Sequence, residues 1–252
     1  MIDINRFNAF TLGWIVVALL LAPIQLYITA PYGRHAATGG PGPRIGNRLG
    51  WCAMEIVSLG VFAGLFLCGT ALKTTPAWIF FVLYVGHYVH RSLIFPWMTQ
   101  TAGKTIPLVI VLGAIVFNTV NGSLNGYYLG SLAAYPVIWL ADPRFAGGLA
   151  LFIVGAAINI RADYTLIALR KDSTDYAIPR GGLFERISCP NHFGEIVEWT
   201  GFAVMCWNLA ALSFAVWTAA NLIPRALSHH RWYRARFAEY PKARKAVIPF
   251  VL

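Results

Sequence analysis

The sequence predicts an all-α membrane protein, a bundle of seven transmembrane helices that forms one integral membrane domain over residues 1–252. Three observations support this fold class. The chain is 58% hydrophobic and only 12% charged, whereas soluble domains are about 25% charged. It contains apolar runs of the length that crosses a bilayer. Basic residues gather between these runs, and helices satisfy their own backbone groups in hydrocarbon.

Five apolar runs each predict one transmembrane helix: 8–30, 49–72, 76–98, 105–121 and 143–162. The first run lacks a basic segment followed by a cleavage site, so we expect a retained span and not a signal peptide. A sixth run, 195–224, is too long for one simple crossing. We expect two short or tilted helices there, divided near Asn208, which brings the total to seven.

The distribution of Lys and Arg predicts which loops face the cytoplasm. Basic residues are common in 31–48, in 161–194 and in the tail from Arg225, whereas 122–142 contains none. Together with Lys104, this places the first, third and fifth loops and the tail in the cytoplasm and the N-terminus outside. We expect a multi-pass protein of the endoplasmic reticulum or of a bacterial inner membrane. The same rule accounts for most of the net charge of +10, so nucleic acid is not expected as a partner.

Two features that suggest other kinds of site are weak. The glycine-rich stretch 39–43 resembles a phosphate-binding loop, but no strand precedes it and no GxGxxG or GxxxxGK[ST] pattern occurs in the chain. A flexible cytoplasmic linker is the expected alternative. The four cysteines are isolated and no CxxC or CxxH spacing is present, so neither a disulfide framework nor a metal site is predicted.

Glu55 is the only formally charged residue in the run 49–72. A carboxyl in hydrocarbon costs a few kcal/mol, so such a residue commonly marks a function. The next run carries four polar residues, Tyr84, His87, Tyr88 and Arg91. At 1.5 Å per residue, Glu55 and Tyr88 lie about 25 and about 18 Å from the turn between two antiparallel helices, so their side chains can meet. A polar cluster that only packs two helices together is the alternative.

Three polar groups share the predicted cytoplasmic side. They are Asn159, Asp163 and Arg170 along one helix face, then Asn191, Glu195 and Glu198, and in the tail Arg225, His229, His230, Arg231, Tyr233 and Arg244. A structural role at a helix N-terminus also explains the second group, and binding of anionic lipid also explains the third. Taken together, cations for phosphates, carboxylates for ribose hydroxyls and amides for a carboxamide suggest a dinucleotide partner.

Several motifs together resemble the membrane steroid 5α-reductase family. They are YGRH at 32–35, HYVHR at 87–91, NG at 121–122, GYYL at 126–129, INIRADY at 158–164, Pro179 with GGLF at 181–184, NHFGEIVEW at 191–199, HHRWY at 229–233 and YPKARKA at 240–246. The resemblance extends over most of the chain. It implies an NADPH-dependent reductase of the 4-ene in 3-oxo steroids, with seven spans, cytoplasmic loops and a C-terminal tail that closes over a cofactor site.

The resemblance also implies roles for particular residues. Glu55 and Tyr88 would be catalytic and hold the 3-oxo group, and Trp51 and Arg91 would complete a substrate pocket formed mainly by the spans in 8–121. The cofactor site would lie mainly in 143–252 and be lined by Asn159, Asp163, Arg170, Tyr176, Asn191, Glu195, Arg225, His229, Tyr233 and Arg244.

The implied reaction delivers a hydride to carbon 5 of a conjugated enone, and negative charge develops on the 3-oxo oxygen. Tyr88 donates a phenol proton to that oxygen, and Glu55 can help in its protonated form, which burial away from cations favours. Protonation of carbon 4, from water, completes the saturation. Two departures from the family pattern remove expected contacts. Met54 stands where a Gln commonly precedes the catalytic Glu, and Ala177 stands where an Arg follows the loop tyrosine.

The expected partners are a steroid or a similar apolar enone and the lipid bilayer, without a metal ion, and the expected state is a monomer. A related membrane reductase of an enoyl thioester or a polyprenol is the nearest alternative. A methyltransferase whose tail holds S-adenosylmethionine and a transporter with a buried proton relay belong to other classes. Measuring whether the protein binds NADPH or S-adenosylmethionine distinguishes a reductase from a methyltransferase.

Overall fold

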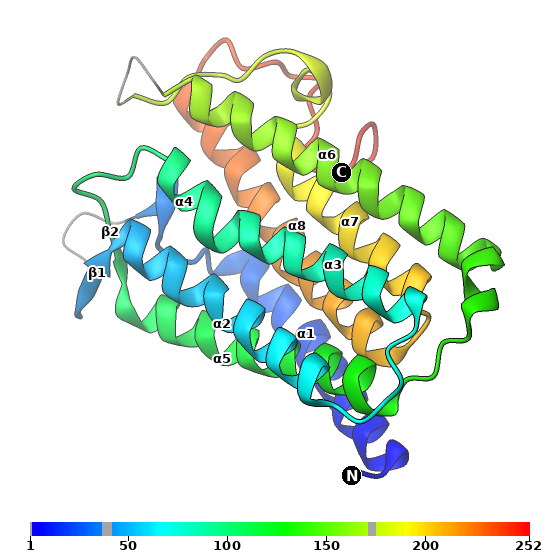
Figure 1. The fold of residues 1–252 in the computed structure, drawn as a ribbon. Coiled ribbons are helices and arrows are strands. Elements are labelled where there is room, and N and C mark those ends of the chain that lie inside the picture. Colours follow the sequence, from blue (N-terminus) through cyan, green and yellow to red (C-terminus); the bar gives the residue numbers. More distant parts are fainter. Residues whose placement is uncertain (1, 37–41, 171–174) are drawn as a thin grey trace. The chain divides into compact units, whose positions relative to one another are not determined.

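The computed structural model describes residues 2–36, 42–170 and 175–252, and these residues are mostly helical (Figure 1). Their α-helices are α1 (Ile4–Tyr27), α2 (Asn47–Cys68), α3 (Thr75–Val89), α4 (Phe95–Met98), α5 (Leu108–Tyr127), α6 (Pro143–Ala168), α7 (Pro190–Cys206) and α8 (Leu209–Arg236). The predicted helical fold class is therefore confirmed. Positions 39–41 of the glycine-rich stretch lie outside the described residues.

Short elements connect or extend the helices. Two strands, β1 (Arg44–Gly46) and β2 (Thr105–Pro107), pair antiparallel next to the starts of α2 and α5. A π-helix at His90–Ile94 joins α3 to α4, and a second one at Tyr128–Leu132 extends α5. The 3-10 turns are Gly33–His35, Val137–Ala141 and Gly182–Glu185.

Six helical segments among the described residues are long and apolar enough to cross a membrane. They are Ile4–Tyr27, Asn47–Cys68, Thr75–Met98, Leu108–Leu132, Pro143–Ala168 and Leu209–Arg236. Each of the five single runs predicted from the sequence falls on one of these segments. Six helices of this length and apolar character indicate a multi-pass membrane protein, because each matches the thickness of the hydrocarbon core.

The long run 195–224 is divided where the sequence predicts. α7 ends at Cys206, and the Asn208 side chain caps α8 by accepting a hydrogen bond from the Ala211 N–H at 2.9 Å. Between the two helices, Trp207 adopts a left-handed backbone conformation with φ of 48°. α7 has 17 residues and is not among the six segments, so the described residues contain six candidate spans where the sequence predicts seven.

The chain divides into two compact units. The first unit contains Met1–Thr11 and Ala30–Phe145, and the second contains Leu12–Thr29 and Ala146–Leu252. Each unit has its own helix packing, and in both units glycines allow two helices to approach closely. α1 contributes its first turns to one unit and its remaining turns to the other.

In the first unit, glycines bring α5 and its π-helical extension against α2. Gly122, Gly126 and Gly130 recur every four residues and share one helix face. A Cβ atom at Gly126 would lie 2.7 Å from the carbonyl oxygen of Phe62, and one at Gly130 would lie 2.4 Å from that of Leu65. A larger residue would therefore overlap the backbone of α2, and this close approach brings the asparagines of α5 to the same helix.

In the second unit, glycines at a spacing of seven join α6 and α7. Gly148 and Gly155 of α6 meet the backbone of α7, while Gly194 and Gly201 of α7 meet the backbone of α6. A Cβ atom at Gly155 would lie 2.3 Å from the backbone nitrogen of Glu198. The two helices are therefore in backbone contact over about two helical turns.

Aromatic side chains hold α8 in the second unit. The ring centroids of Trp199 and Phe214 are 4.0 Å apart, and both side chains are buried. Further along α8, the indole N–H of Trp217 donates to the carbonyl of Trp14 in α1 at 3.0 Å. These contacts make α8 the centre of the second unit's core.

Asp142 caps the start of α6. Its carboxylate accepts a hydrogen bond from the Arg144 N–H at 2.8 Å and is paired with the Arg144 guanidinium at 2.7 Å. The side-chain hydrogen bonds from Arg144, followed by the backbone one, lower the pKa of Asp142 from 3.8 to about 2. Because the folded-state pKa is lowered, the cap stabilises the fold above the usual pKa and is lost as the pH falls toward 2.

Replacement of Gly155 with Ala is expected to destabilise the second unit. The new Cβ atom would overlap the backbone of α7, and overpacking of this kind costs about 1–3 kcal/mol. Gly147→Ala is the matched control, because a Cβ atom at that position of α6 meets nothing within 4 Å. Thermal unfolding in detergent should give a lower midpoint for Gly155→Ala than for Gly147→Ala. Equal midpoints would show that the approach of α6 and α7 does not limit stability.

Candidate active site

A buried, hydrogen-bonded cluster lies in the first unit, formed by side chains of α2, α3 and α5. At its centre, the Tyr84 hydroxyl lies 2.8 Å from Ser58 Oγ and accepts a hydrogen bond from Asn121 Nδ2 at 3.2 Å. Asn125 Nδ2 in turn donates to the backbone and side-chain oxygens of Asn121. All four side chains are buried. Because buried polar groups without partners are costly, the mutual hydrogen bonds explain how apolar helices tolerate this cluster.

Glu55 and Tyr88 belong to the same cluster. The Tyr88 ring centroid lies 4.9 Å from that of Tyr84, with the two rings tilted by 31°. Tyr88 is buried, with 3% of its surface exposed. Glu55 is half-buried, lies one helical turn before Ser58 on α2, and is close enough to Tyr84 to interact with it electrostatically. The structure thus places one carboxyl and one further phenol near Tyr84.

Trp51 and Arg91 are in contact with each other. The guanidinium carbon of Arg91 lies 5.3 Å from the Trp51 ring centroid and 5.0 Å from that of Phe95. Arg91 falls in the π-helix, which interrupts the regular spacing of α3, and such insertions are frequent at functional sites. Trp51 precedes Glu55 by one turn, and its indole N–H is buried without a hydrogen-bond partner among the described residues.

Met54, the first departure from the family pattern, is a core residue in this chain. Its side chain is 4% exposed and packs in a hydrophobic cluster with Ile106 and Val111. Its carbonyl accepts a hydrogen bond from Asn118 Nδ2 at 2.8 Å. An apolar side chain fits this environment, because its buried neighbours Ile106 and Val111 are apolar.

A second polar network joins the end of α6 to the start of α7 in the second unit. Asn191 Nδ2 donates to Asp163 Oδ1 at 2.9 Å. Asn159 Nδ2 donates to the Asn191 carbonyl at 3.0 Å and to Glu195 Oε2 at 3.4 Å. Asn159 and Asp163 are buried, whereas Asn191 and Glu195 are half-buried. Four residues that the resemblance assigns to the cofactor therefore lie in one hydrogen-bonded group.

Aromatic rings flank the cations of the same unit. The Arg170 guanidinium lies 4.4 Å from the Tyr176 ring centroid, and Tyr176 packs edge-on against Trp232 with centroids 4.9 Å apart. Tyr233 is buried and stacks on Tyr240, with centroids 5.2 Å apart and an interplanar angle of 8°. These contacts place Arg170, Tyr176 and Tyr233 around the end of α8 and the tail that follows it.

Arg225 and His229 lie one turn apart on α8, and both are half-buried. The His229 ring centroid is 5.4 Å from that of His192, near the start of α7. In the described ranges, no group of three or more His, Cys, Asp or Glu side chains is arranged to hold a metal ion. The two histidines are therefore placed beside the Asn191 network without forming part of such a group.

Arg244 is a buried cation in the tail. It is 2% exposed, and its Nη1 donates to the carbonyl of Pro179 at 3.2 Å. Nη2 lies 3.9 Å from Glu185 Oε2, which is within ion-pair range but too long for a hydrogen bond. Within the described part of the chain, Nε and Nη2 have no hydrogen-bond partner. A buried guanidinium with unused donors is suited to binding an anion.

The buried hydroxyl of Ser188 attaches the tail to the segment before α7. Ser188 Oγ lies 2.6 Å from His230 Nδ1 and 2.7 Å from the Tyr240 hydroxyl, and it donates to the Lys245 carbonyl at 3.0 Å. The Ser188 N–H also donates to the Lys245 carbonyl, at 2.8 Å. A serine hydroxyl has one proton, so once that proton is given to Lys245, His230 and Tyr240 act as donors to the oxygen.

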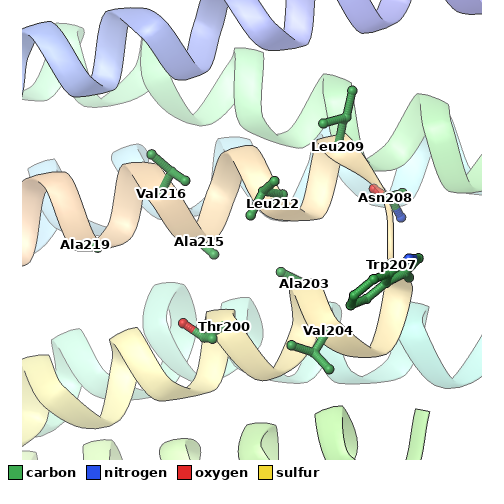
Figure 2. A pocket seen from close by; sticks show the side chains of 10 residues that line it. All are labelled: Thr200, Ala203, Val204, Trp207, Asn208, Leu209, Leu212, Ala215, Val216 and Ala219. Carbon is green, nitrogen blue, oxygen red and sulfur yellow. The ribbon is translucent and has the colours of Figure 1, made fainter. Parts of the chain in front are cut away.

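An apolar pocket of about 550 Å³ lies between α7 and α8 of the second unit (Figure 2). Its lining includes Thr200, Ala203, Val204, Leu212 and Val216. The residues predicted to bind substrate or cofactor, all of them described, are absent from this lining. The pocket is therefore separate from the hydrogen-bonded groups of either unit.

Comparison with known proteins relates this arrangement to a family of enzymes. Residues 104–252 match the family described as 3-oxo-5-alpha-steroid 4-dehydrogenase. The chain is 43% identical over 230 residues to 3-oxo-5-alpha-steroid 4-dehydrogenase 1 of Bos taurus, with 89% of each chain covered. It is 41% identical over 241 residues to a steroid 5-alpha-reductase of Arabidopsis thaliana, covering 91% of this chain and 90% of the relative. The chain belongs to the 3-oxo-5-alpha-steroid 4-dehydrogenase family.

This membership confirms the resemblance that the sequence motifs indicate. The chain is also 42% identical over 223 residues to 3-oxo-5-alpha-steroid 4-dehydrogenase 1 of Homo sapiens, and these residues cover 87% of this chain and 85% of that relative. Enzymes of the 3-oxo-5-alpha-steroid 4-dehydrogenase family are oxidoreductases that act on CH–CH groups, and this chain is an enzyme of that class.

Several polar side chains in this 3-oxo-5-alpha-steroid 4-dehydrogenase family member form hydrogen bonds that the sequence does not predict, among them those of Ser58, Asn121 and Ser188. Ser58 carries no signal beyond a hydroxyl in an apolar run. Asn121 lies in the NG motif, but its contact with α3 depends on how the helices pack. Ser188 was not singled out, because a serine in a loop has no distinctive pattern, although it has three side-chain hydrogen-bond contacts.

Ser188→Ala is expected to loosen the tail. The change leaves the side chains of His230 and Tyr240 without their shared partner, which costs about 1–3 kcal/mol, while the Lys245 carbonyl keeps its hydrogen bond from the N–H of residue 188. Hydrogen exchange should be faster for the amides of 240–247 than in the unchanged protein. Ser213→Ala is the control, because the Ser213 hydroxyl donates, among the described residues, to the Ala210 carbonyl of its own helix. Unchanged exchange in Ser188→Ala would show that other contacts hold the tail.

Proposed function

We propose that this chain reduces the 4-ene double bond of 3-oxo-4-ene steroids to 5α-3-oxo steroids, with NADPH as the reductant. The names of its relatives describe them as 3-oxo-5-alpha-steroid 4-dehydrogenases. The observation that carries the proposal is the cluster in the first unit, where buried Tyr88 and the carboxyl of Glu55 lie on apolar helices around Tyr84. Such a pair suits one carbonyl oxygen on an otherwise apolar ligand.

The proposed chemistry depends on charge at the 3-oxo oxygen. Bound NADPH supplies a hydride, which carbon 5 of the conjugated enone accepts. The carbon–carbon double bond then shifts toward carbon 3, and negative charge develops on the oxygen as the enolate forms. Tyr88 donates a hydrogen bond to this oxygen, and protonated Glu55 donates a second. Donors placed in advance in a site without water are each worth about 3 kcal/mol of barrier.

The remaining steps need only a proton. Water protonates carbon 4 of the enolate, so the substrate gains one hydride and one proton overall. Tyr88 and Glu55 keep their protons at the end of the cycle, because they stabilise the charge without transferring them. Trp51 contributes a buried indole N–H and Arg91 covers its ring, and we assign both to the wall of the substrate pocket.

Glu55→Gln is expected to retain more activity than Glu55→Leu, because an amide N–H can still donate to the oxygen. Loss of one donor of this type lowers kcat by roughly 100–1000-fold, so the Leu variant should fall to that level and the Gln variant should lie well above it. A spectrophotometric assay of NADPH oxidation with testosterone measures both. Equal kcat values in the two variants, with unchanged NADPH affinity, would contradict the donor role.

The second unit contains groups that fit the cofactor. The unused donors of buried Arg244 suit a phosphate, and Arg170 and Arg225 would supply further positive charge. The network of Asn159, Asp163, Asn191 and Glu195 offers carboxylates for ribose hydroxyls and amides for the nicotinamide carboxamide. Tyr176, His229 and Tyr233 would complete the site. Ala177 lacks the charge of the family pattern, so we assign the phosphates to the other arginines.

The attachment of the tail at Ser188 supports a closing role for the C-terminal residues. Arg244 lies next to Lys245, whose carbonyl and N–H are both held by the segment before α7. Closure of the tail over the cofactor would bury the phosphates and exclude water from the hydride. The reaction benefits from this closure, because reduced nicotinamides decompose in acid and a dry site strengthens the electrostatic interactions with the developing charge.

Arg244→Ala is expected to weaken NADPH binding by roughly 10–100-fold, the range for a lost charged hydrogen bond. Asp163→Ala should act in the same direction through the ribose contact. The control is Arg236→Ala, because Arg236 is an exposed arginine in the same tail region. Calorimetric titration of the purified protein with NADPH measures all three. Wild-type affinity in Arg244→Ala and Asp163→Ala would remove both residues from the cofactor site.

We also propose that α7 forms a seventh crossing, with the cofactor-binding loops and the tail on the cytoplasmic side. A helix of 17 residues is about 25 Å long, close to the thickness of the hydrocarbon core. The break at Trp207 and Asn208 returns the chain at once into α8, so the loop before α7 and the tail after α8 lie on one side. Both are rich in basic residues, as cytoplasmic loops are.

A further inference from the structure

We propose that Ser188 is a positioning residue for Arg244 and holds its guanidinium in place before the cofactor binds. The inference rests on the proposed function, in which Arg244 binds a phosphate of NADPH. Ser188 itself is assigned to neither the substrate site nor the cofactor site. Its side chain is buried, with 3% of its surface exposed, and its hydroxyl has three hydrogen-bond contacts.

Arg244 is costly to bury in this position. Its side chain donates one hydrogen bond, from Nη1 to the Pro179 carbonyl at 3.2 Å, and its ion pair with Glu185 is long, at 3.9 Å. Nε and Nη2 are buried, and neither has a hydrogen-bond partner within the described ranges. A cation with unused donors is more favourable in water than inside a protein. Other contacts must therefore keep Arg244 buried until an anion binds.

The first of these contacts is the ring of Tyr240. The guanidinium carbon of Arg244 lies 5.0 Å from the ring centroid, within the range of a cation–π interaction. The ring is buried and stacks on that of Tyr233, with centroids 5.2 Å apart. Its hydroxyl lies 2.7 Å from Ser188 Oγ. Ser188 therefore fixes the hydroxyl end of the ring that supports Arg244.

The second contact is the backbone that follows Arg244. The Lys245 carbonyl accepts hydrogen bonds from the Ser188 N–H at 2.8 Å and from the Ser188 hydroxyl at 3.0 Å. The Lys245 N–H donates to the Arg186 carbonyl at 2.9 Å. Both polar backbone groups of Lys245 are thus held by the segment before α7. The tail cannot leave this segment at Arg244 without breaking these bonds.

Both contacts meet at the Ser188 hydroxyl. It links the ring beneath Arg244 to the backbone beside it, and His230 Nδ1 of α8 joins the same oxygen at 2.6 Å. A binding group that is already held loses little conformational freedom when its ligand arrives, and this increases affinity. Ser188 therefore contributes to NADPH affinity through Arg244, without a contact of its own to the cofactor.

The test is a double-mutant cycle on NADPH affinity, measured by calorimetric titration of the full chain in detergent. Ser188→Ala should weaken NADPH binding by roughly 3–10-fold, the effect of about one hydrogen bond. In an Arg244→Ala background the same change should weaken binding by less than about twofold, because the group that it positions is gone. Ser213→Ala is the control, since this buried serine of the same unit donates to the Ala210 carbonyl within its own helix.

The salt dependence of binding gives a second readout. Ser188→Ala should make NADPH affinity less sensitive to ionic strength than in the unchanged protein, because the charged contact of Arg244 with a phosphate is weakened. A general loosening of the tail would lower the affinity without changing its dependence on salt. An unchanged salt dependence in Ser188→Ala would therefore contradict the positioning role.

The outcomes separate this inference from the proposed function. An equal loss of affinity for Ser188→Ala in both backgrounds, or no loss in either, would overturn the positioning role alone. Wild-type affinity in Arg244→Ala would remove Arg244 from the cofactor site, and the inference with it. Absence of NADPH binding by the unchanged protein would overturn the proposed function.

A second variant serves if Ser188→Ala fails to fold. Tyr240→Phe keeps the ring beneath Arg244 and removes its 2.7 Å contact with Ser188. Its loss of NADPH affinity should likewise vanish in the Arg244→Ala background. An undiminished loss in that background would also overturn the inference.

Discussion

Polar side chains inside membrane helices must find partners within the protein, because hydrocarbon offers none. In the first unit this requirement is met around Tyr84, whose hydroxyl contacts Ser58 and Asn121 and whose ring packs against Tyr88. Each of these groups, buried alone, would cost several kcal/mol. Together they form a network whose members fix one another's positions. The same network holds the Tyr88 ring beside that of Tyr84, and Glu55 lies close enough to Tyr84 to interact with it electrostatically.

The glycines of α5 let this helix approach α2 closely enough for the network to form. Gly122 lies against α2, and a Cβ atom there would be 3.2 Å from the Ser58 carbonyl oxygen. Its neighbour Asn121 is therefore carried to within hydrogen-bonding distance of Tyr84 on α3. A larger residue at Gly122 would push the helices apart and break the contact. Backbone packing, rather than side-chain length, thus determines where the polar groups of the first unit meet.

In the second unit, polar side chains are brought together by the close approach of α6 and α7. Gly155 and Gly194 bring α6 and α7 into contact just before the polar network of Asn159 and Asn191 begins. The amides and carboxylates are thereby held by one another before any ligand binds. In the tail, Arg244 is held only partly, by one carbonyl and a long ion pair. This difference explains why we assign the phosphates to Arg244 and the more weakly charged parts of the cofactor to the network.

Much of this organisation can be predicted from the sequence. Apolar length identifies five spans, and an asparagine inside an overlong run identifies the division before α8, because capping chemistry is local. The proximity of Glu55 and the Tyr84–Tyr88 face also follows from helix geometry. The roles of Ser58 and Asn121 do not, because they depend on the depth to which glycines let α2 and α5 approach.

Two other features depend on geometry that has no local pattern in the sequence. The π-helix moves Arg91 out of the regular spacing of α3 and onto Trp51. The attachment of the tail through Ser188 joins residues that are more than forty positions apart, at His230 and Tyr240. The family motifs include Arg91, His230 and Tyr240 but not Trp51 or Ser188, and they do not state which residues are in contact. The sequence therefore indicates which residues belong to a site better than it indicates which of them are in contact.

The central claim is that a phenol and a neutral carboxyl stabilise an enolate oxygen while a hydride is added to the adjacent enone. The most direct test is mass spectrometry of testosterone after incubation with the purified protein and NADPH in deuterated water. The account predicts a product that has gained one hydrogen from NADPH at carbon 5 and one deuterium from solvent at carbon 4. Recovery of unreduced testosterone, or reduction of the 3-oxo group with the double bond intact, would contradict it.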